Sequence, residues 1–275
     1  MIHRSTGHDT SNEPRDELGR WAASGSSKEQ DLVARYLPGA TPAQVRSAFR
    51  GEFGNKQLFT KVSSIEETIR EGETSQENRP CLAVGGEIFY GARRVGMFKR
   101  FFFNHDGKTP EVYHDLVEIE EAKFTHTGFG PEFIENSENW YRQWGIKEVR
   151  LSANISVGSY AWAKLGFDFA DEATRQRVLD AFATWTKKRG SPLNTTKIHA
   201  LKHAWDVAAC DDGHSYHVQR SNLNGEPEID GDYPIGKAFL LEVHPVWSGV
   251  QQLDQKSTSQ RLFRRYLRLH NKGRA

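Results

Sequence analysis

The stretch that decides the fold runs from Lys123 to Phe167 and reads KFTHTGFGPEFIENSENWYRQWGIKEVRLSANISVGSYAWAKLGF. It opens with a loop in which Gly128 and Gly130 let the backbone turn sharply. Pro131 suits the first position of a helix, where its missing N–H costs nothing. Free N–H groups at such a helix start form an anion site that suits a pyrophosphate. Two glycines alone are more typical of an ordinary strand-to-helix turn than of an anion site, so the residues that follow have to decide.

The residues after the loop alternate between helical and strand patterns. Aromatic side chains spaced for one helical face, Phe133, Trp140 and Trp144, predict an amphipathic helix that packs on a sheet. Gly145 is a typical helix end. The predicted order is then a strand over 147–153, a helix over about 156–164, a Leu-Gly-Phe turn and a strand over 167–169.

This succession of strand, Gly-x-Gly, helix, Gly-Ile, strand, Asn, helix and Leu-Gly-Phe resembles the core of the GNAT superfamily of acyl-CoA-dependent N-acetyltransferases. In that family the glycine loop holds the coenzyme A pyrophosphate. The strand before the loop splays from its neighbour, and the pantetheine and acetyl groups lie in the gap. Thr125 stands where the family prefers Gln or Arg, and Trp162 stands where it usually has tyrosine. The resemblance implies an α+β fold in which helices flank a mixed, mostly antiparallel sheet, with a helical insertion and a C-terminal helix.

The resemblance also implies a reaction and the residues that perform it. An acyl group would pass from acetyl-CoA, or another acyl-CoA, to an amine on a protein, a nucleobase or a small molecule. Glu118 would accept the proton of the amine, with His114 and His126 as alternatives, and Tyr160 would face the leaving thiolate. The residues expected to hold the coenzyme are Val117, Ile119, Thr125, His126, Thr127, Gly128, Phe129, Gly130 and Asn154.

Composition limits the class of protein. The chain has 275 residues, of which 37% are hydrophobic and 11% aromatic, so it can bury a sizeable core. A net charge of +1 argues against a protein that is basic overall, as many nucleic-acid and membrane-surface proteins are. The two cysteines, Cys81 and Cys210, predict neither a disulfide framework nor a metal cluster. No run approaches the roughly 18 apolar residues of a membrane span, so we expect a soluble, cytoplasmic protein without a membrane partner.

The N-terminal residues, 1–27, are polar and predict a mobile tail. Pro14-Arg15-Asp16-Glu17-Leu18-Gly19-Arg20-Trp21 resembles a short segment of bacteriophage head-associated polypeptides. That resemblance implies a phage-encoded protein, either virion-associated or in the host cytoplasm, whose tail docks on phage head proteins through Trp21. A solvated linker is the alternative interpretation.

Upstream of the glycine loop we predict helices first and strands afterwards. Helices are expected over 29–37 and from Thr41, and another from Ser63 or Ser64, so that residues 28–75 form an N-terminal helical segment. The polar stretch 71–80 is the expected boundary of a domain over 76–250. The strands predicted after it form a meander over 81–90, with a break at Gly85-Gly86, then 95–103 and 112–119.

Downstream of the loop region we predict a long helix over 171–189 and another over 195–209, then a loop-rich stretch to 233 and a strand over 235–243. Residues 171–234 form either an insertion that caps the acceptor site or part of a second small domain. His199 and His203 would share one helical face, but no third ligand has a suitable spacing, so we predict no metal site.

The C-terminal residues, 251–275, predict a basic amphipathic helix that can contact nucleic acid, an acidic protein or the phosphates of the coenzyme. A solvated docking helix is the alternative interpretation. Two further hypotheses therefore accompany the acyltransferase. One is an inactive structural protein of a phage head with the same fold. The other is an enzyme of this fold that modifies nucleobases of phage DNA.

Overall fold

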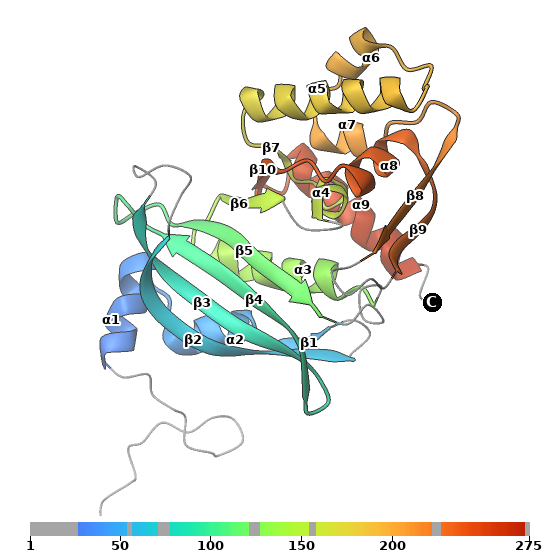
Figure 1. The fold of residues 1–275 in the computed structure, drawn as a ribbon. Coiled ribbons are helices and arrows are strands. Elements are labelled where there is room, and N and C mark those ends of the chain that lie inside the picture. Colours follow the sequence, from blue (N-terminus) through green and yellow to red (C-terminus); the bar gives the residue numbers. More distant parts are fainter. Residues whose placement is uncertain are drawn as a thin grey trace, which may run out of the picture.

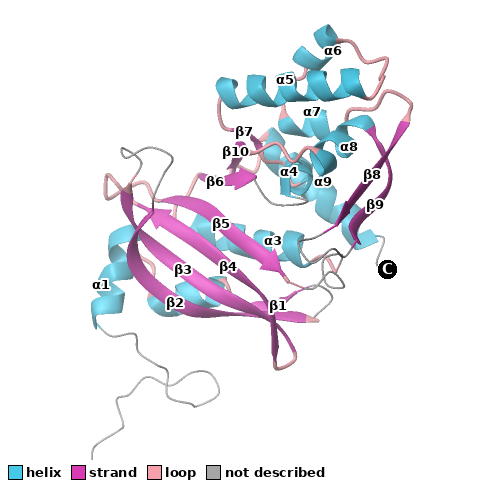
Figure 2. Cartoon of the chain, viewed as in Figure 1, coloured by secondary structure: helices cyan, strands magenta, loops and turns pink. Residues whose placement is uncertain are grey.

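The structure is a computed structural model that describes residues 27–53, 57–70, 78–120, 127–153, 158–221 and 227–272. A mixed sheet with the strand order β1-β2-β3-β4-β5-β6-β10-β7 organises the chain, and helices flank it (Figure 2). Every neighbouring pair is antiparallel except β5 and β6. This arrangement confirms the predicted α+β class. The strands are β1 (Gly51–Phe53), β2 (Leu58–Arg70), β3 (Arg79–Tyr90), β4 (Arg93–Phe103), β5 (Glu111–Ile119), β6 (Glu148–Ala153), β7 (Asp168–Phe169) and β10 (Trp247–Gln252).

The first half of the sheet is a meander, β2 to β5, whose apolar face is covered by helices α1 (Ser27–Tyr36), α2 (Pro42–Ala48) and α3 (Phe129–Gln143) (Figure 1). Helix α2 begins with a capping box in which the Thr41 side chain and the Gln44 side chain each bond the other residue's backbone. The Phe49 ring then packs on Phe98 and Phe133. The opposite face of these strands carries a smaller cluster, Cys81, Ala83, Phe101 and Phe103.

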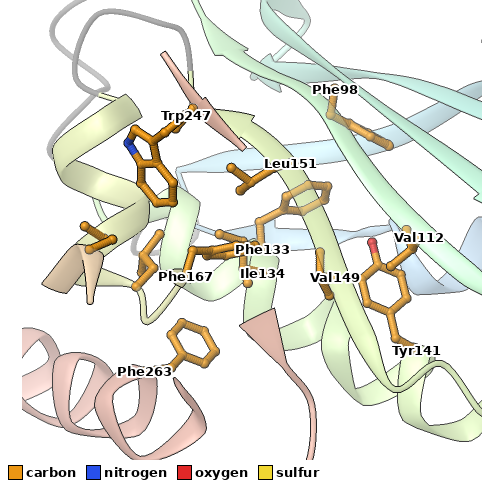
Figure 3. Packing of buried hydrophobic residues seen from close by; sticks show 14 of the residues in the cluster. Phe98, Val112, Phe133, Ile134, Tyr141, Val149, Leu151, Phe167, Trp247 and Phe263 are labelled. Atoms are coloured by element: carbon orange, nitrogen blue, oxygen red, sulfur yellow. The ribbon is translucent and has the colours of Figure 1, made fainter. Parts of the chain in front are cut away.

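The second half adds α4 (Gly158–Lys164), which joins β6 to β7, and α9 (Thr258–Lys272), which follows β10. Side chains of α3, β6, β10 and α9 meet in one core; Figure 3 labels among them Phe133, Leu151, Trp247 and Phe263. The turn before β7 requires Gly166, whose φ is +88° and whose missing Cβ would lie 2.4 Å from the backbone oxygen of Ser259 on α9. The Leu-Gly-Phe sequence therefore allows α9 to approach the backbone of this turn.

Residues between β7 and β10 form a separate layer beside these two strands (Figure 1). They comprise α5 (Glu172–Lys188), α6 (Thr195–His199), α7 (Ala204–Ala208), the hairpin β8 (Ser215–Ser221) and β9 (Pro227–Pro234), and α8 (Ile235–Glu242). The Phe182 and Phe239 rings pack 4.7 Å apart between α5 and α8. Since β7 and β10 are neighbours in the sheet, this layer interrupts an otherwise direct strand pair.

Two predictions upstream of the glycine loop were wrong. The helix expected from Ser63 or Ser64 is the strand β2, which pairs with β3 along its length, so residues 28–75 are not a separate helical segment. The β-branched side chains of this stretch, which include Thr60, Val62 and Ile65, favour a strand, and they outweigh the serine signal for a helix start. Gly85-Gly86 does not break β3, because the Phe98 ring of β4 occupies the place of a Gly86 side chain.

Three predictions downstream were also wrong. The helix expected over 195–209 divides into α6 and α7, because Asp168 bonds the Ala204 N–H and the His203 ring. His199 and His203 therefore do not share a helix. The loop-rich stretch contains the β8–β9 hairpin. The strand expected over 235–243 is instead helix α8. A short apolar run that is buried on several sides has no periodicity that distinguishes a helix from a strand.

None of the helices in the described part of the chain combines the length and the apolar character needed to cross a membrane.

The close approach at Gly166 is testable by comparing two alanine substitutions. Gly166→Ala meets both a left-handed backbone and the Ser259 oxygen, whereas Gly190→Ala meets only the backbone strain, since its φ is +68° with no atom within 4 Å of a Cβ. We expect Gly166→Ala to lower the free energy of unfolding by about 1–3 kcal/mol more than Gly190→Ala in urea titrations. Equal losses would contradict the close packing of α9 on this turn.

Candidate functional site

Strands β5 and β6 separate after a short paired segment. They pair only through Val112–His114 and Val149–Leu151, after which β5 continues beside β4 to Ile119 and β6 continues beside β10. We call this feature the β5–β6 divergence. In the described residues no strand pairs with the outer edge of residues 115–119, so backbone groups on that edge are available to an extended ligand.

A bulge in β5 begins at the same place. Lys99 of β4 pairs with Leu116, but the next residue, Arg100, pairs with His114, which leaves Asp115 as an extra residue. A bulge bends its strand and increases the local twist. The bulge thus turns the second half of β5 away from β6.

A buried arginine occupies the bulge. The Arg100 side chain is fully buried, and its Nη1 donates to the carbonyl oxygens of Lys99 at 2.8 Å and Leu116 at 2.7 Å. These two residues flank the bulge on its two strands. Nε and Nη2 have no hydrogen-bond partner among the described residues, although the guanidinium carbon lies 5.5 Å from the centre of the Phe133 ring. Burial lowers the pKa of Arg100, and the nearby Tyr141 and Asp115 oppose that shift.

His114 is the last residue of β5 paired with β6, and its ring is 3% exposed. Its Nε2 lies 3.0 Å from the Tyr141 hydroxyl of α3, and its Nδ1 has no partner among the described residues. Burial, and to a smaller extent Arg100, holds the pKa of His114 well below its ordinary value, so the ring is neutral at neutral pH. Burial likewise raises the pKa of Tyr141 to about 12. Sequence reasoning named His114 only as an alternative base and missed Tyr141, which it could not distinguish from the aromatic stripe of α3.

The start of α3 supplies free N–H groups beyond the end of β5. Gly128 caps the helix with φ +84°, and Phe129 and Gly130 are its first two residues, so Pro131 stands third and not first as predicted. The N–H groups of Phe129 and Gly130 have no acceptor within the helix, and Pro131 has none to offer. Together with the helix dipole they make a site suited to an anion.

The loop residues differ in what they present to a ligand. Phe129 is 1% exposed and its ring meets the Phe53 ring edge-on at 5.7 Å, so its side chain belongs to the core and does not contact a ligand. A Cβ added at Gly130 would meet no atom within 4 Å. Thr127 precedes the cap, whereas the other predicted coenzyme-binding residues of this kind, Thr125, His126 and Asn154, lie outside the described residues.

Glu118 lies on the second half of β5 and is exposed. It pairs with Met97, and directly paired residues share a face of the sheet. The adjacent pair, Val117 and Phe98, points the other way, and Phe98 packs in the core under α3. Glu118 therefore projects from the face opposite His114 and α3. Val117 and Ile119 are partly buried against the core and can offer a ligand their backbone.

Tyr160 and Trp162 face different neighbours. Tyr160 lies 5.2 Å from Lys237 Nζ of α8, measured to the ring centre, and burial followed by the nearby Tyr266 raises its pKa. Trp162 instead lies beside His114, with ring centres 6.4 Å apart. The structure thus brings Trp162 to the β5–β6 divergence and directs Tyr160 toward the layer between β7 and β10.

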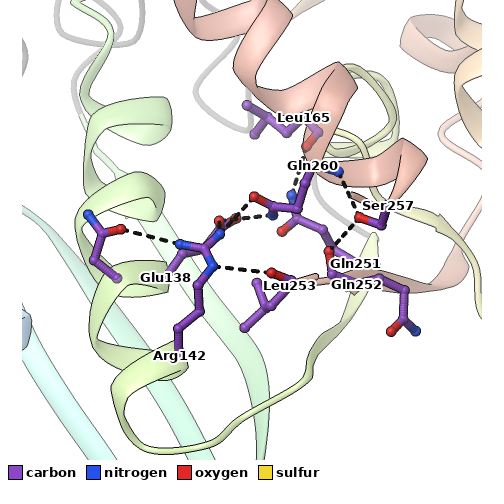
Figure 4. Close-up of polar contacts among 9 residues, drawn as sticks. Glu138, Arg142, Leu165, Gln251, Gln252, Leu253, Ser257 and Gln260 are labelled. Atoms are coloured by element: carbon purple, nitrogen blue, oxygen red, sulfur yellow. Dashed lines mark hydrogen bonds and ion pairs between the residues drawn. The ribbon is translucent and has the colours of Figure 1, made fainter. Parts of the chain in front are cut away.

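A second polar cluster joins α3 to α9 (Figure 4). The Glu138 side chain, 1% exposed, accepts from Arg142 Nη2 at 2.6 Å and from Gln260 Nε2 at 2.9 Å. Arg142 Nε also donates to the Leu253 carbonyl at 3.1 Å. Burial raises the pKa of Glu138 to about 7 despite the opposing effect of these hydrogen bonds. No local pattern predicts this cluster, because it joins two segments that lie more than 100 residues apart in the chain.

The cluster borders a groove of about 250 Å³ between α3 and α9, and a second groove lies beside α5 and α6. Neither groove is lined by residues of the β5–β6 divergence. Among the described residues no three His, Cys, Asp or Glu side chains gather in a way that could hold a metal ion.

No protein-family model and no curated protein matches the chain.

The buried Glu138 predicts a pH dependence of stability. Its pKa is raised on folding from about 4.5 to about 7, so the folded state binds more protons than the unfolded state in that interval. Glu138 therefore contributes fully to the free energy of unfolding below pH 4.5. This contribution is lost as the pH rises to 7, at up to about 1.4 kcal/mol per pH unit. Urea unfolding between pH 4.5 and 8 should show this slope.

Glu138→Gln is the matched control, since it removes the titrating group while keeping its size. We expect the difference in unfolding free energy between the wild type and this variant to change with pH in that interval. Curves that run parallel would contradict the prediction, because they would show that the pKa of Glu138 does not change on folding. Comparing the two proteins also cancels the opposite contribution of His114, whose neutral buried form loses stability as pH falls.

Proposed function

We propose that this chain binds acetyl-CoA or another acyl-CoA and transfers the acyl group to an amine, in the manner of the GNAT superfamily that its sequence resembles. The observation that carries the proposal is the β5–β6 divergence, which lies directly before the Gly128-capped start of α3. An extended pantetheine would pair with the free edge of β5. The pyrophosphate would accept hydrogen bonds from the N–H groups of Phe129 and Gly130.

The chemistry follows from the residues along this edge. A neutral amine attacks the thioester carbon, a C–N bond forms, the C–S bond breaks, and coenzyme A leaves as its thiolate. Glu118 accepts the proton that the nitrogen loses. The backbone between Val117 and Ile119 stabilises the oxygen on which negative charge develops. Because Glu118 projects from the face opposite α3, the amine would approach from that open face of the sheet.

One observation favours a second candidate, a protein of this fold that binds without catalysis. Trp162, which lacks a hydroxyl group, is the α4 side chain beside His114, while Tyr160 contacts Lys237. Helix α4 thus directs no phenol to the place where the thiolate would leave. A structural role in a phage head fits this candidate, and the N-terminal residues that motivate it lie outside the described part of the chain.

The acceptor is proposed only as a class. The exposed arginines of α9, which recur at helical spacing along one face, favour an acceptor that carries negative charge, such as a nucleic acid. They are Arg261, Arg264, Arg265 and Arg268. Modification of a nucleobase is one form that this activity would take, and acylation of a protein or small-molecule amine is the other.

Titration calorimetry with acetyl-CoA tests whether the chain binds the coenzyme. The Gly130→Ala variant tests whether the coenzyme binds at the start of α3. The added methyl group meets no atom of the protein and favours the helix by about 0.5–1 kcal/mol, so the variant should be at least as stable as the wild type. It should nevertheless bind acetyl-CoA about tenfold more weakly, because the methyl group occupies the approach to the free N–H groups. Gly190→Ala, at the far end of α5, should leave the affinity unchanged.

Wild-type protein that does not bind acetyl-CoA would contradict the proposal. Binding without release of a free thiol, in the presence of protein, nucleic-acid and small-molecule amines, would favour the non-catalytic candidate. Equal affinity of the wild type and Gly130→Ala would place the coenzyme elsewhere on the molecule.

A further inference from the structure

Two lysines and two tyrosines gather where α4, α8 and β9 meet, away from the β5–β6 divergence. Lys237 of α8 places its Nζ 4.1 Å from the centre of the Tyr233 ring and 5.2 Å from that of the Tyr160 ring. Lys164, at the end of α4, is close enough to act on Lys237: burial is the main cause that lowers the pKa of Lys237, and Lys164 is the second. Figure 1 shows α4 and α8 side by side in this region.

Within the described part of the chain, this positive charge has no negative partner. No carboxylate of the described residues forms an ion pair with Lys164 or Lys237, and none contributes to the pKa of Lys237. The chain contains 36 Asp and Glu residues, so a shortage of carboxylates is not the reason. Lys237 is also the third residue of α8, where the positive end of the helix dipole disfavours a cation.

The two tyrosine rings account for only part of this arrangement. Their faces attract the Lys237 ammonium through cation–π contacts. They do nothing for Lys164, which adds a second positive charge beside Lys237. A cation that is half-buried beside another cation and a positive helix end weakens the fold, and such arrangements are typical of sites that bind an anion.

We propose that Lys164 and Lys237, with the hydroxyl groups and ring faces of Tyr160 and Tyr233, bind a phosphate monoester. Its charge would pair with both ammonium groups, and a planar group attached to it would stack on a tyrosine. The phosphate could belong to either of two molecules. If it is the 3′-phosphate of coenzyme A, the site rests on the proposed function and extends it. If it belongs to a phosphorylated acceptor, the site identifies the substrate class, and the layer between β7 and β10 forms the acceptor side.

The experiment compares three probes on the wild type, Lys237→Met and a control. The probes are coenzyme A, dephospho-coenzyme A, which lacks the 3′-phosphate, and inorganic phosphate, each followed by calorimetry and by thermal shift. Lys237→Met keeps the apolar stem and removes the charge, so we expect its melting temperature to equal or exceed that of the wild type. Lys188→Met, at the exposed end of α5, is the matched control. Lys164→Gln changes an exposed side chain and provides a second variant that should fold.

A coenzyme source predicts that the wild type and Lys188→Met bind coenzyme A about 10- to 100-fold more tightly than dephospho-coenzyme A, the range expected for charge-assisted hydrogen bonds. Lys237→Met and Lys164→Gln should lose most of that difference. An acceptor source predicts equal binding of the two coenzymes, with a thermal shift by inorganic phosphate that Lys237→Met abolishes.

Equal responses of the wild type and Lys237→Met to all three probes would overturn the proposal. Its failure is distinct from that of the acyl-CoA function. A wild type that responds to inorganic phosphate but to neither coenzyme would retain the anion site and refute the acyltransferase. If coenzyme A and dephospho-coenzyme A bind equally to the wild type and to Lys237→Met, and inorganic phosphate has no effect, the anion site would be refuted. The acyl-CoA function would then be retained.

Discussion

The hydrogen bonds from Arg100 to the carbonyls of Lys99 and Leu116 are the contacts on which the proposed site depends. They occupy the place where the ladder between β4 and β5 is interrupted by the bulge at Asp115. Buried carbonyls left without a donor would each cost about 1–3 kcal/mol. By supplying that donor, Arg100 allows β5 to bend away from β6 while it stays paired with β4. A charged side chain is tolerated there because Tyr141 and Asp115 partly offset its burial.

The rest of the fold fixes the two sides of this divergence. On one side α3 carries its glycine cap and its two free N–H groups, and the Glu138 cluster ties the same helix to α9. On the other side β6 is held by β10, and Gly166 brings α9 against the turn before β7. The layer between β7 and β10 then adds Lys237 beside Tyr160 of α4. Helices α3, α4 and α9 thus connect the divergence, the buried carboxylate and the lysine cluster through packing contacts.

Local patterns predicted much of the fold, and tertiary contacts decided the remainder. Caps, glycines and alternation located α2, α3, β4, β5 and β6, because each of these signals acts within a few residues. The prediction for β2 was wrong because the serine signal for a helix start was given more weight than the β-branched residues that favour a strand. The prediction for α8 was wrong because a continuous apolar run has no period. The candidate site divides in the same way. Its glycines are visible in the sequence, whereas the pairing of Arg100 with a bulge, of His114 with Tyr141 and of Glu138 with Gln260 requires the fold.

Hydrogen–deuterium exchange with and without acetyl-CoA tests the central claim that the β5–β6 divergence receives an acyl-CoA. The backbone amides of residues 115–119, which have no strand on their outer edge, should exchange more slowly when the coenzyme is bound, together with those of Phe129 and Gly130. Amides in the middle of β3, which are paired on both sides, should not change. Binding that protects other segments and leaves residues 115–119 unaffected would contradict the account.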